Sequence, residues 1–286
     1  MSASTSLIPC SVVVLTLNEE KNIGDAIRSV RSFAEIVVVD SLSSDQTVGI
    51  AEQAGARTFS NPFETFAKQR NWAHENAHLG YDWVLHLDAD ERMTPDLEAQ
   101  VAEAVAKSDP AIAGYYLAEK TMLHGKWLRR AAQFPRFQAR LLNRRRASFI
   151  DYGHGQRERS DHRFDYLSAP YLHLAFSHGL QHWLRKHANY ATQEAQQILA
   201  EEQDSKSLVN GFFSTEPSLR RRAFKFVAMR LPFRPTLRWL YVLFVKRGIL
   251  DGKTGWQYAR MMWLFQHMVD FSLDAARREA PKGRLQ

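Results

Sequence analysis

The chain has little of what exported or membrane-spanning proteins require. Its 286 residues include one cysteine, Cys10, so it has no internal disulfide framework, as is usual in a reducing compartment. No stretch approaches the roughly 20 apolar residues that a membrane-spanning helix needs. The N-terminus lacks the succession of charged, apolar and small residues that marks an export signal. These absences predict a cytoplasmic protein, and they leave room for peripheral attachment to a membrane.

Acidic residues are missing from two long segments. From Lys120 to Arg146 there are nine Lys/Arg and no Asp/Glu, and the same is true from Pro217 to Leu250. The whole chain carries a formal net charge of +7. Such segregation of charge favours an anionic partner, which could be a membrane surface, a phosphorylated substrate or a nucleic acid.

The first part of the chain alternates between apolar runs and helix-like segments. Continuous apolar runs at 11–17, 35–39 and 83–87 are typical of strands that are covered on both faces. Segments with apolar residues at helical spacing follow each run, and Thr94-Pro95 offers an N-cap and an N-terminal proline for the last of them. The alternation predicts an α/β fold with a mainly parallel sheet and helices on both faces.

The pattern changes after about residue 107. Residues 112–122 and 137–150 are typical of longer strands, which predicts an antiparallel or mixed extension of the sheet. From about residue 179 to the end, the pattern indicates helices.

Polar and acidic residues follow each of the three predicted parallel strands. The segments are Asn18-Glu19-Glu20, residues 40–45, and Asp88-Ala89-Asp90-Glu91. Ligands of open α/β sheets bind beyond the carboxyl ends of the strands. A helix cap or a solvated loop would explain any one segment, Asp45 in particular. Three in succession favour a ligand site, because crowded carboxylates repel each other unless a cation lies among them.

The Asp88-Ala89-Asp90 turn emerges from a buried strand where the sheet meets solvent. Two carboxylates one residue apart can present oxygens to one hard divalent ion. Mg²⁺ and Mn²⁺ prefer such ligands and leave positions for water and phosphate oxygens. A bare D-x-D pattern is common by chance, but its position after residues 83–87 leads us to predict a Mg²⁺ or Mn²⁺ site here.

These segments resemble the nucleotide-binding half of the family 2 glycosyltransferases, which have the GT-A fold. The similar residues are 11–20, 36–45 and 85–91, and the order and spacing extend over roughly the first 110 residues. In that family the first strand ends beside the nucleoside, the acid ending the second strand contacts the uracil, and the D-x-D binds the diphosphate through a metal. The resemblance therefore implies a nucleotide-sugar site made by Thr16, Leu17, Glu19, Asp40, Asp88 and Asp90.

The segment 66–72 is also similar to the part of the family that precedes the third strand. The resemblance implies that Lys68 or Arg70 reaches the base or a phosphate. For each of them, a position on a solvated helix face is the alternative.

A looser resemblance extends to the branch that adds sugars to lipopolysaccharide core or similar lipid-linked glycans. The shared features are the D-A-D-E turn, an R-L-hydrophobic-R-R stretch at residues 140–145, and a K-H-x-x-Y pattern at residues 186–190. This resemblance implies a nucleotide-sugar donor and a glycolipid or other lipid-linked saccharide as the acceptor.

Pattern and resemblance together predict the domain organisation. We expect a GT-A catalytic domain over 1–215, with a nucleotide-sugar half at about 8–110 and an acceptor half at about 111–215. A basic amphipathic helical extension is expected over 216–286.

Transfer from a nucleotide-sugar requires that the departing diphosphate is neutralised and that the acceptor hydroxyl loses its proton. Related proteins commonly carry a His-Glu pair in the region that corresponds to residues 151–158, and this chain departs from that pattern. Glu158 is the closest match for the general base, and Asp151 and His154 are alternatives. The family implies inversion at the anomeric carbon.

His173 lies in an apolar segment, residues 170–174, where a lone histidine is usually a hydrogen-bonded core residue. In some GT-A enzymes a later histidine completes the metal site. The resemblance therefore implies His173 as a possible metal ligand beside Asp88 and Asp90.

Arginines and large apolar residues are mixed through residues 219–248. The combination favours an amphipathic segment at an anionic membrane surface, because a hydrated helix does not need so many apolar groups and a core helix does not tolerate so many cations. Packing on the catalytic domain or on a second subunit is the alternative. Nucleic acid is disfavoured as a partner, because no known binding motif is present and the acidic strand ends would repel phosphate without a metal.

The sequence thus predicts an inverting glycosyltransferase at the inner face of a bacterial membrane, where it is a peripheral protein. It would use a UDP-sugar and Mg²⁺ or Mn²⁺. A polyprenyl-phosphate sugar transferase and a non-catalytic membrane-surface adaptor are the alternatives.

Overall fold

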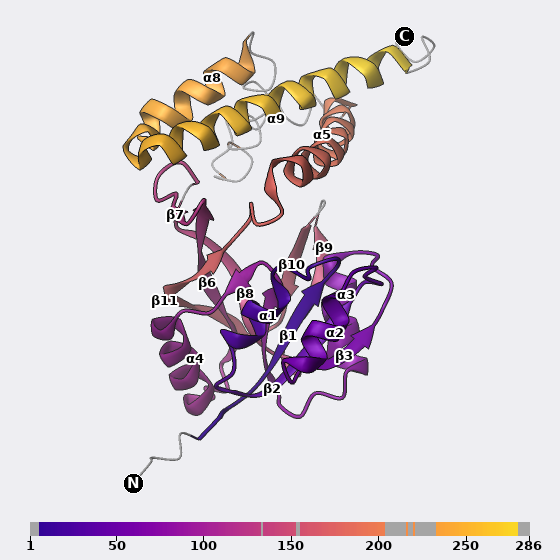
Figure 1. Cartoon of the computed structure of the whole chain (residues 1–286), viewed down its shortest axis with the longest axis vertical. Coiled ribbons are helices and arrows are strands. Elements are labelled where there is room, and N and C mark those ends of the chain that lie inside the picture. The colour runs from indigo at the N-terminus through magenta and orange to yellow at the C-terminus, as the bar shows by residue number, and fades with distance from the viewer. Residues whose placement is uncertain are drawn as a thin grey trace. The chain divides into compact units, whose positions relative to one another are not determined.

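The computed structural model describes residues 6–132, 134–152, 155–203, 216, 220 and 233–279 (Figure 1). The chain forms two compact units. The first comprises Met1–Trp127 and Phe134–Ser177, and the second comprises Leu128–Gln133 and His178–Gln286.

The first unit is built on a mixed sheet with the strand order β3-β2-β1-β4-β8-β6-β11-β5, and β7 pairs with β6. A separate hairpin is made by β9 and β10. The strands are β1 (Ile8–Thr16), β2 (Phe33–Asp40), β3 (Arg57–Ser60), β4 (Trp83–Asp88), β5 (Glu91–Arg92), β6 (Ile112–Leu123), β7 (Lys126–Trp127), β8 (Arg136–Asn143), β9 (Ser148–Tyr152), β10 (Gly155–Arg159) and β11 (Arg163–His173). The three predicted parallel strands are β1, β2 and β4, and β1 lies between the other two.

Helices cover both faces of the parallel part, as the sequence predicts. They are α1 (Ile23–Arg28), α2 (Thr47–Gln53), α3 (Phe66–Asn76) and α4 (Pro95–Lys107). Residues of α1, α2 and α4 pack against Val12 and Val14 on one face of β1, whereas α3 packs against Val13 on the other. Because successive strand residues point to opposite faces, a continuous apolar run is what a sheet covered on both sides requires.

The second half of the sheet is antiparallel to the first where the two meet. Strand β8 pairs antiparallel with both β4 and β6, and β6 pairs parallel with β11. The predicted strand over 137–150 is divided, because β8 ends at Asn143 and β9 begins at Ser148. Between β6 and β8 the register shifts so that Tyr115 faces Leu141 and Tyr116 faces Ala139, which leaves Arg140 as the extra residue of a bulge.

The second unit is helical, as predicted for the chain after residue 179. It contains α5 (Gly179–Gln203), α8 (Arg234–Leu240), a π-helical turn η2 (Tyr241–Val245), a 3₁₀ turn η3 (Gly248–Asp251) and α9 (Gly252–Glu279). Apolar residues of α5 are buried against α9, and they include Ala191 and Ala195 against Val269. The compact units therefore divide between Ser177 and His178, whereas the sequence predicts a division at 215/216. No described helix is long and apolar enough to cross a bilayer.

Candidate functional site

The ends of β1, β2 and β4 lie side by side at one edge of the sheet. Thr16 is in register with Asp40, and Leu15 is in register with Asp88. Because all three strands run in the same direction, the polar segments that follow them meet at this edge. The structure therefore brings Glu19, Asp40 and Asp88 to this one edge of the sheet.

The loops after β1 and β2 are tied together by hydrogen bonds. Asp40 is 2% exposed, and its carboxylate accepts hydrogen bonds from the backbone N–H and the hydroxyl of Ser43. The Ser43 hydroxyl oxygen in turn accepts the N–H of Asn18 at 2.7 Å. Thr16 at the end of β1 is buried, whereas the next residue, Leu17, is 50% exposed. The loop pair is therefore an ordered platform that exposes two apolar side chains, Leu17 and Leu42, to solvent.

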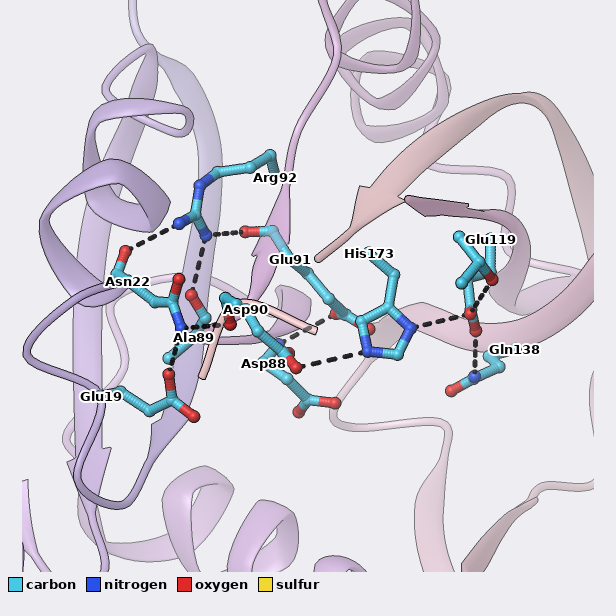
Figure 2. A network of polar contacts seen from close by, with 12 residues as sticks. Glu19, Asn22, Asp88, Ala89, Asp90, Glu91, Arg92, Glu119, Gln138 and His173 are labelled. Atoms are coloured by element: carbon cyan, nitrogen blue, oxygen red, sulfur yellow. Dashed lines mark hydrogen bonds and ion pairs between the residues drawn. The ribbon is translucent and has the colours of Figure 1, made fainter. Parts of the chain in front are cut away.

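Glu19 is connected to the acidic turn by a short polar network (Figure 2). Its carboxylate accepts a hydrogen bond from the Asn22 side chain at 2.6 Å. The carbonyl of Asn22 accepts from Arg92 at 3.0 Å, and Arg92 also donates to the carbonyl of Ala89 at 2.8 Å. The β1 loop and the turn after β4 thus share one buried guanidinium, which sets the distance between them.

Two buried arginines engage the carboxylate of Asp88. Arg70 of α3 donates to one oxygen at 2.8 Å, and Arg140 of β8 donates to the other at 2.9 Å. Although burial opposes ionisation, Arg140 and Arg70 hold the pKa of Asp88 well below its usual range. Asp88 is therefore ionised and has both oxygens occupied by guanidinium groups.

Glu91 completes this buried charge cluster. Its carboxylate accepts the backbone N–H of Asp88 at 2.9 Å and contacts Arg140. Burial raises the pKa of Glu91, Arg140 lowers it and the charge on Asp88 raises it. The net result is a pKa of about 7. Arg140 thus links two acids of the D-A-D-E turn.

The imidazole of His173 lies between two carboxylates (Figure 2). Its Nε2 is 3.3 Å from Asp90, and its Nδ1 is 2.7 Å from Glu119. Burial alone would lower the pKa of His173, but the hydrogen bonds to Asp90 and Glu119 raise it to about 10. Glu119 is itself buried, yet His173 and Arg136 lower its pKa to about 2. The structure thus joins Asp90 to His173, which are far apart in the sequence.

A pocket of about 430 Å³ lies beside Asp88, between α3, the sheet and the β9–β10 hairpin. Its lining residues are Phe66, Arg70, Asp88, Tyr116, Phe137, Gln138, Ala139, Arg140, Phe149, Gly155, Gln156, Arg157 and Glu158. The hydroxyl of Tyr116 donates a hydrogen bond to the carboxylate of Glu158. Burial and this hydrogen bond raise the pKa of Tyr116. The pocket therefore combines aromatic walls, cations and one carboxylate that accepts from a tyrosine.

Comparison with known proteins now adds to this geometry. A family model described as "Glycosyl transferase family 2" matches residues 11–163, which is more than half of the chain. The chain belongs to glycosyl transferase family 2. The resemblance noted in the sequence is thereby confirmed, and the mixed, mainly parallel sheet with helices on both faces is the expected GT-A fold.

Individual relatives of this glycosyl transferase family 2 chain match part of it. An uncharacterized glycosyltransferase of Rickettsia felis is 34% identical over 148 residues, which cover 49% of this chain and 50% of the relative. The lipopolysaccharide core biosynthesis glycosyltransferase LpsC of Rhizobium meliloti is 35% identical over 123 residues, covering 41% and 44%. The chain thus spans about half the length of the curated relatives it matches.

Among solved structures, the glucosyl-3-phosphoglycerate synthase of Mycobacterium tuberculosis in complex with Mn²⁺, UDP-glucose and phosphoglyceric acid is 24% identical to this family 2 chain. The match covers 39% of this chain and 44% of that chain, with a TM-score of 0.33.

The other residues singled out in the sequence are placed less centrally in this family 2 domain. Lys68 lies on the exposed side of α3 and pairs with Glu64, which precedes that helix, and this carboxylate raises the pKa of Lys68. Asp151 is exposed on β9 and does not line the described pocket, whereas Glu158 on β10 does. His154 lies outside the described residues.

Sequence reasoning did not assign individual roles to Arg140, Glu119 and Tyr116. Arg140 was seen only as part of the R-L-hydrophobic-R-R stretch. A sequence signal for Glu119 did exist, since it is an acid inside the predicted strand 112–122, and the structure shows that it is 3% exposed. A buried acid in a strand requires a partner. Here the partners are His173 and Gln138, which Figure 2 shows, together with Arg136.

Proposed function

We propose that the protein is an inverting glycosyltransferase that moves a sugar from a nucleotide-diphosphate sugar, a UDP-sugar, to a lipid-linked saccharide such as lipopolysaccharide core. The observation that carries the proposal is the position of the Asp88–Asp90 turn, at one sheet edge with Glu19 and Asp40 and beside the pocket that contains Glu158. The family and the 35% identity to LpsC support the reaction class and the acceptor class.

The donor would bind over the ends of β1 and β2. Thr16, Leu17, Glu19 and Asp40 would hold the nucleoside, because they form the ordered platform and Leu17 offers an apolar surface to a base. Asp88 would keep Arg70 and Arg140 in place at the end of β4. We assign phosphate contact to Arg70 rather than to Lys68, because Lys68 is exposed and paired with Glu64.

Asp90 and His173 would hold the Mg²⁺ or Mn²⁺ ion, and His173 would give up, on metal binding, the proton that its hydrogen bonds to Asp90 and Glu119 hold on it in the metal-free protein. The facing atoms of Asp90 and His173 are 3.3 Å apart, close to the roughly 3 Å between neighbouring ligands of an octahedral ion with bonds of about 2.1 Å. Asp88 is a less direct candidate, since both its oxygens face arginines. Within the described residues no three His, Cys, Asp or Glu side chains form a metal cluster, which leaves phosphate oxygens and water as further ligands. The ion, when bound, would neutralise charge on the departing diphosphate.

Glu158 would act as the general base in the pocket beside Asp88. It would remove the proton of the acceptor hydroxyl while the hydroxyl oxygen attacks the anomeric carbon. The bond from that carbon to the diphosphate breaks, and the diphosphate leaves with the electron pair, so the configuration inverts. Phe66, Phe137 and Phe149 would provide apolar contacts for an acceptor sugar. Asp151 is the alternative base.

A lipid-linked acceptor would place the protein at the cytoplasmic face of the inner membrane as a peripheral protein. Polyprenyl phosphate is the alternative acceptor, since a phosphate oxygen needs no strong base. This alternative predicts that transfer survives the loss of both Glu158 and Asp151.

A thermal-shift screen of UDP, GDP and TDP, each with and without Mn²⁺, tests the donor side. We expect stabilisation that needs UDP and Mn²⁺ together. UDP release from a panel of UDP-sugars, with lipopolysaccharide core or polyprenyl phosphate added, then tests the acceptor. If no nucleotide stabilises the protein in the presence of Mn²⁺, the proposed function is wrong and a non-catalytic adaptor is favoured.

A further inference from the structure

The segment from Phe233 through α8 and η2 carries an exposed apolar stripe. Its residues are Phe233, Leu237, Leu240, Tyr241, Phe244 and Val245, with exposed fractions of 81%, 45%, 38%, 37%, 59% and 69%. Phe233, Leu237, Leu240 and Phe244 recur at spacings of three or four residues, and Tyr241 and Val245 adjoin the last two, which places all six on one side of a helix. The opposite side is used by the fold, since Val242 and Leu243 are buried with Ala259 of α9 and Ala131. The apolar stripe therefore faces away from the core of its own unit.

The apolar surface continues beyond the stripe into the turn and the next helix. Ile249 and Leu250 in η3 are 47% and 65% exposed. In α9, Trp256, Trp263 and Phe271 recur at spacings of seven and eight residues and are 42%, 39% and 70% exposed. Two neighbouring helices and the turn between them (Figure 1) thus expose many large side chains, more than the scattered surface leucines of ordinary soluble proteins.

Positive charge accompanies this apolar surface. From Thr236 to Leu264 there are five Lys/Arg and a single acid, Asp251. The cations are Arg238, Lys246, Arg247, Lys253 and Arg260. Two of them lie at the edge of the stripe, since Arg238 is 5.5 Å and Lys246 is 5.8 Å from the ring of Tyr241.

The one acid in the segment 236–264, Asp251, has a structural role within its unit. Asp251 accepts the backbone N–H of Arg130 at 2.9 Å and that of Ala131 at 2.8 Å. Its charge is therefore directed at backbone donors of the segment 128–133. The segment 236–264 contains no other carboxylate that could balance the cations around the stripe.

We propose that the apolar stripe docks on an anionic lipid bilayer, with the apolar side chains in the acyl boundary and the surrounding cations at the lipid phosphates. Exposed tryptophan, phenylalanine and leucine flanked by Lys and Arg are what a helix lying in the membrane interface requires. A second copy of the chain fits less well, because a symmetric contact would bring two sets of like charges together. This inference assigns a specific surface to the peripheral membrane location proposed above. It rests on the proposed function only in taking the acceptor to be lipid-linked.

Vesicle sedimentation with the full chain, without any substrate, tests the proposal. We expect binding to vesicles of phosphatidylcholine mixed with phosphatidylglycerol, weaker binding to phosphatidylcholine alone, and release by salt. The double variant Phe244→Glu/Val245→Glu should lose at least about tenfold in binding to both kinds of vesicle, because its charges enter the apolar side. The matched control is Leu180→Glu/Gln181→Glu, which places the same two charges on neighbouring exposed residues of α5.

The double variant Arg238→Gln/Lys246→Gln tests the electrostatic part. At about 1 kcal/mol for each cation near an anionic surface, binding to phosphatidylglycerol-containing vesicles should fall by about 30-fold, with little change on phosphatidylcholine. Arg185→Gln/Lys186→Gln on α5 is its control. Unchanged vesicle binding in the Phe244/Val245 variant overturns the proposal, and so does a stable dimer in solution that this variant dissociates. Transfer to a soluble acceptor should stay unchanged in both variants, which separates failure of docking from failure of the proposed function.

Discussion

The Nε2 atom of His173 lies 3.3 Å from a carboxylate oxygen of Asp90. The pairing of β11 with β5 brings them together, because His173 is in register with Glu91, the residue after Asp90. The backbone N–H of Leu174 also donates to the carbonyl of Asp90 at 2.8 Å. The contact is therefore fixed by backbone on both sides and is well suited to hold a third atom between the two side chains.

Asp90→Asn should abolish the Mn²⁺-dependent part of nucleotide binding and lower transfer by at least about 100-fold, because it removes charge where diphosphate charge develops. Mn²⁺ titration in the presence of UDP and initial transfer rates are the measurements. Asp96→Asn, an exposed acid in the first turn of α4, is the control and should behave as wild type. Full metal-dependent turnover in Asp90→Asn would contradict the assignment of Asp90 as a metal ligand.

Glu119→Gln should weaken Mn²⁺ binding by about 10- to 100-fold, because the carboxylate that orients the imidazole of His173 is lost. Electron paramagnetic resonance of bound Mn²⁺ measures this without reference to catalysis. Arg136→Gln separates the effects, since it removes the other ion pair of Glu119 and leaves the His173 contact in place. Equal losses of Mn²⁺ affinity in both variants would show that Glu119 acts on fold stability instead.

Glu158→Gln should lower kcat by about 100-fold or more and leave UDP affinity unchanged, because only proton removal from the acceptor is lost. Tyr116→Phe should have a smaller effect on kcat, since it removes the hydrogen bond to Glu158 and not the base. Asp151→Asn is the comparison. If Asp151→Asn is the inactive variant, the base has been assigned to the wrong carboxylate.

Arg140→Leu should lower the free energy of unfolding by about 3–5 kcal/mol, because it removes the guanidinium that the buried acid Glu91 and the partly buried Asp88 share. Denaturant unfolding followed by circular dichroism measures the change. Arg145→Leu is the matched control: its ion pair with Asp82 is exposed, so its loss should amount to about 1 kcal/mol at most. Similar losses in the two variants would show that the buried cluster is not coupled to folding.

Protonation of His74 should make the folded protein less stable in mild acid. Burial, with Arg144 and Arg70 nearby, lowers the pKa of His74 from 6.5 to about 4 in the folded state. The unfolded chain then binds more protons between these values, so the free energy of unfolding falls as pH decreases below about 6.5 and levels off near 4. We expect a loss of about 2 kcal/mol from this group between pH 7.5 and pH 5.

The control for this pH dependence is His74→Gln, which keeps a hydrogen-bonding group opposite His86, whose Nε2 is 2.9 Å from that of His74. Denaturant unfolding at several pH values should show a shallower slope in His74→Gln than in wild type. Equal slopes would mean that His74 does not titrate between the two states.

The parallel half of the fold was predictable because its signals are local. Continuous apolar runs mark strands buried on two faces, and each is followed within a few residues by the acids that meet at the sheet edge. The positions of Asp40 and Asp88 follow from strand direction alone. The same reasoning located the helical C-terminal part, but it could not show that α5 packs against α9, because that contact joins residues about 75 apart in the chain, such as Ala195 and Val269.

The antiparallel half was less predictable because its contacts depend on register. Whether Arg140 points toward Asp88 is decided by a one-residue bulge between β6 and β8, and no local pattern marks that bulge. Glu119 and His173 meet because β6 and β11 run parallel, a pairing that the sequence does not specify. The proposal of Glu158 over Asp151 likewise depends on the β9–β10 hairpin, which places Glu158 in the lining of the pocket.

The ion pair between Asp88 and Arg140 crosses from β4 to β8, the strands at which the parallel and antiparallel halves of the sheet join. The two halves are consequently not interchangeable parts. A chimera that grafts the second half of another family member onto residues 6–110 of this chain must bring a guanidinium to the same place. Without it, the graft inherits Glu91 as a buried acid without its guanidinium partner, while Asp88 keeps only the ion pair with Arg70.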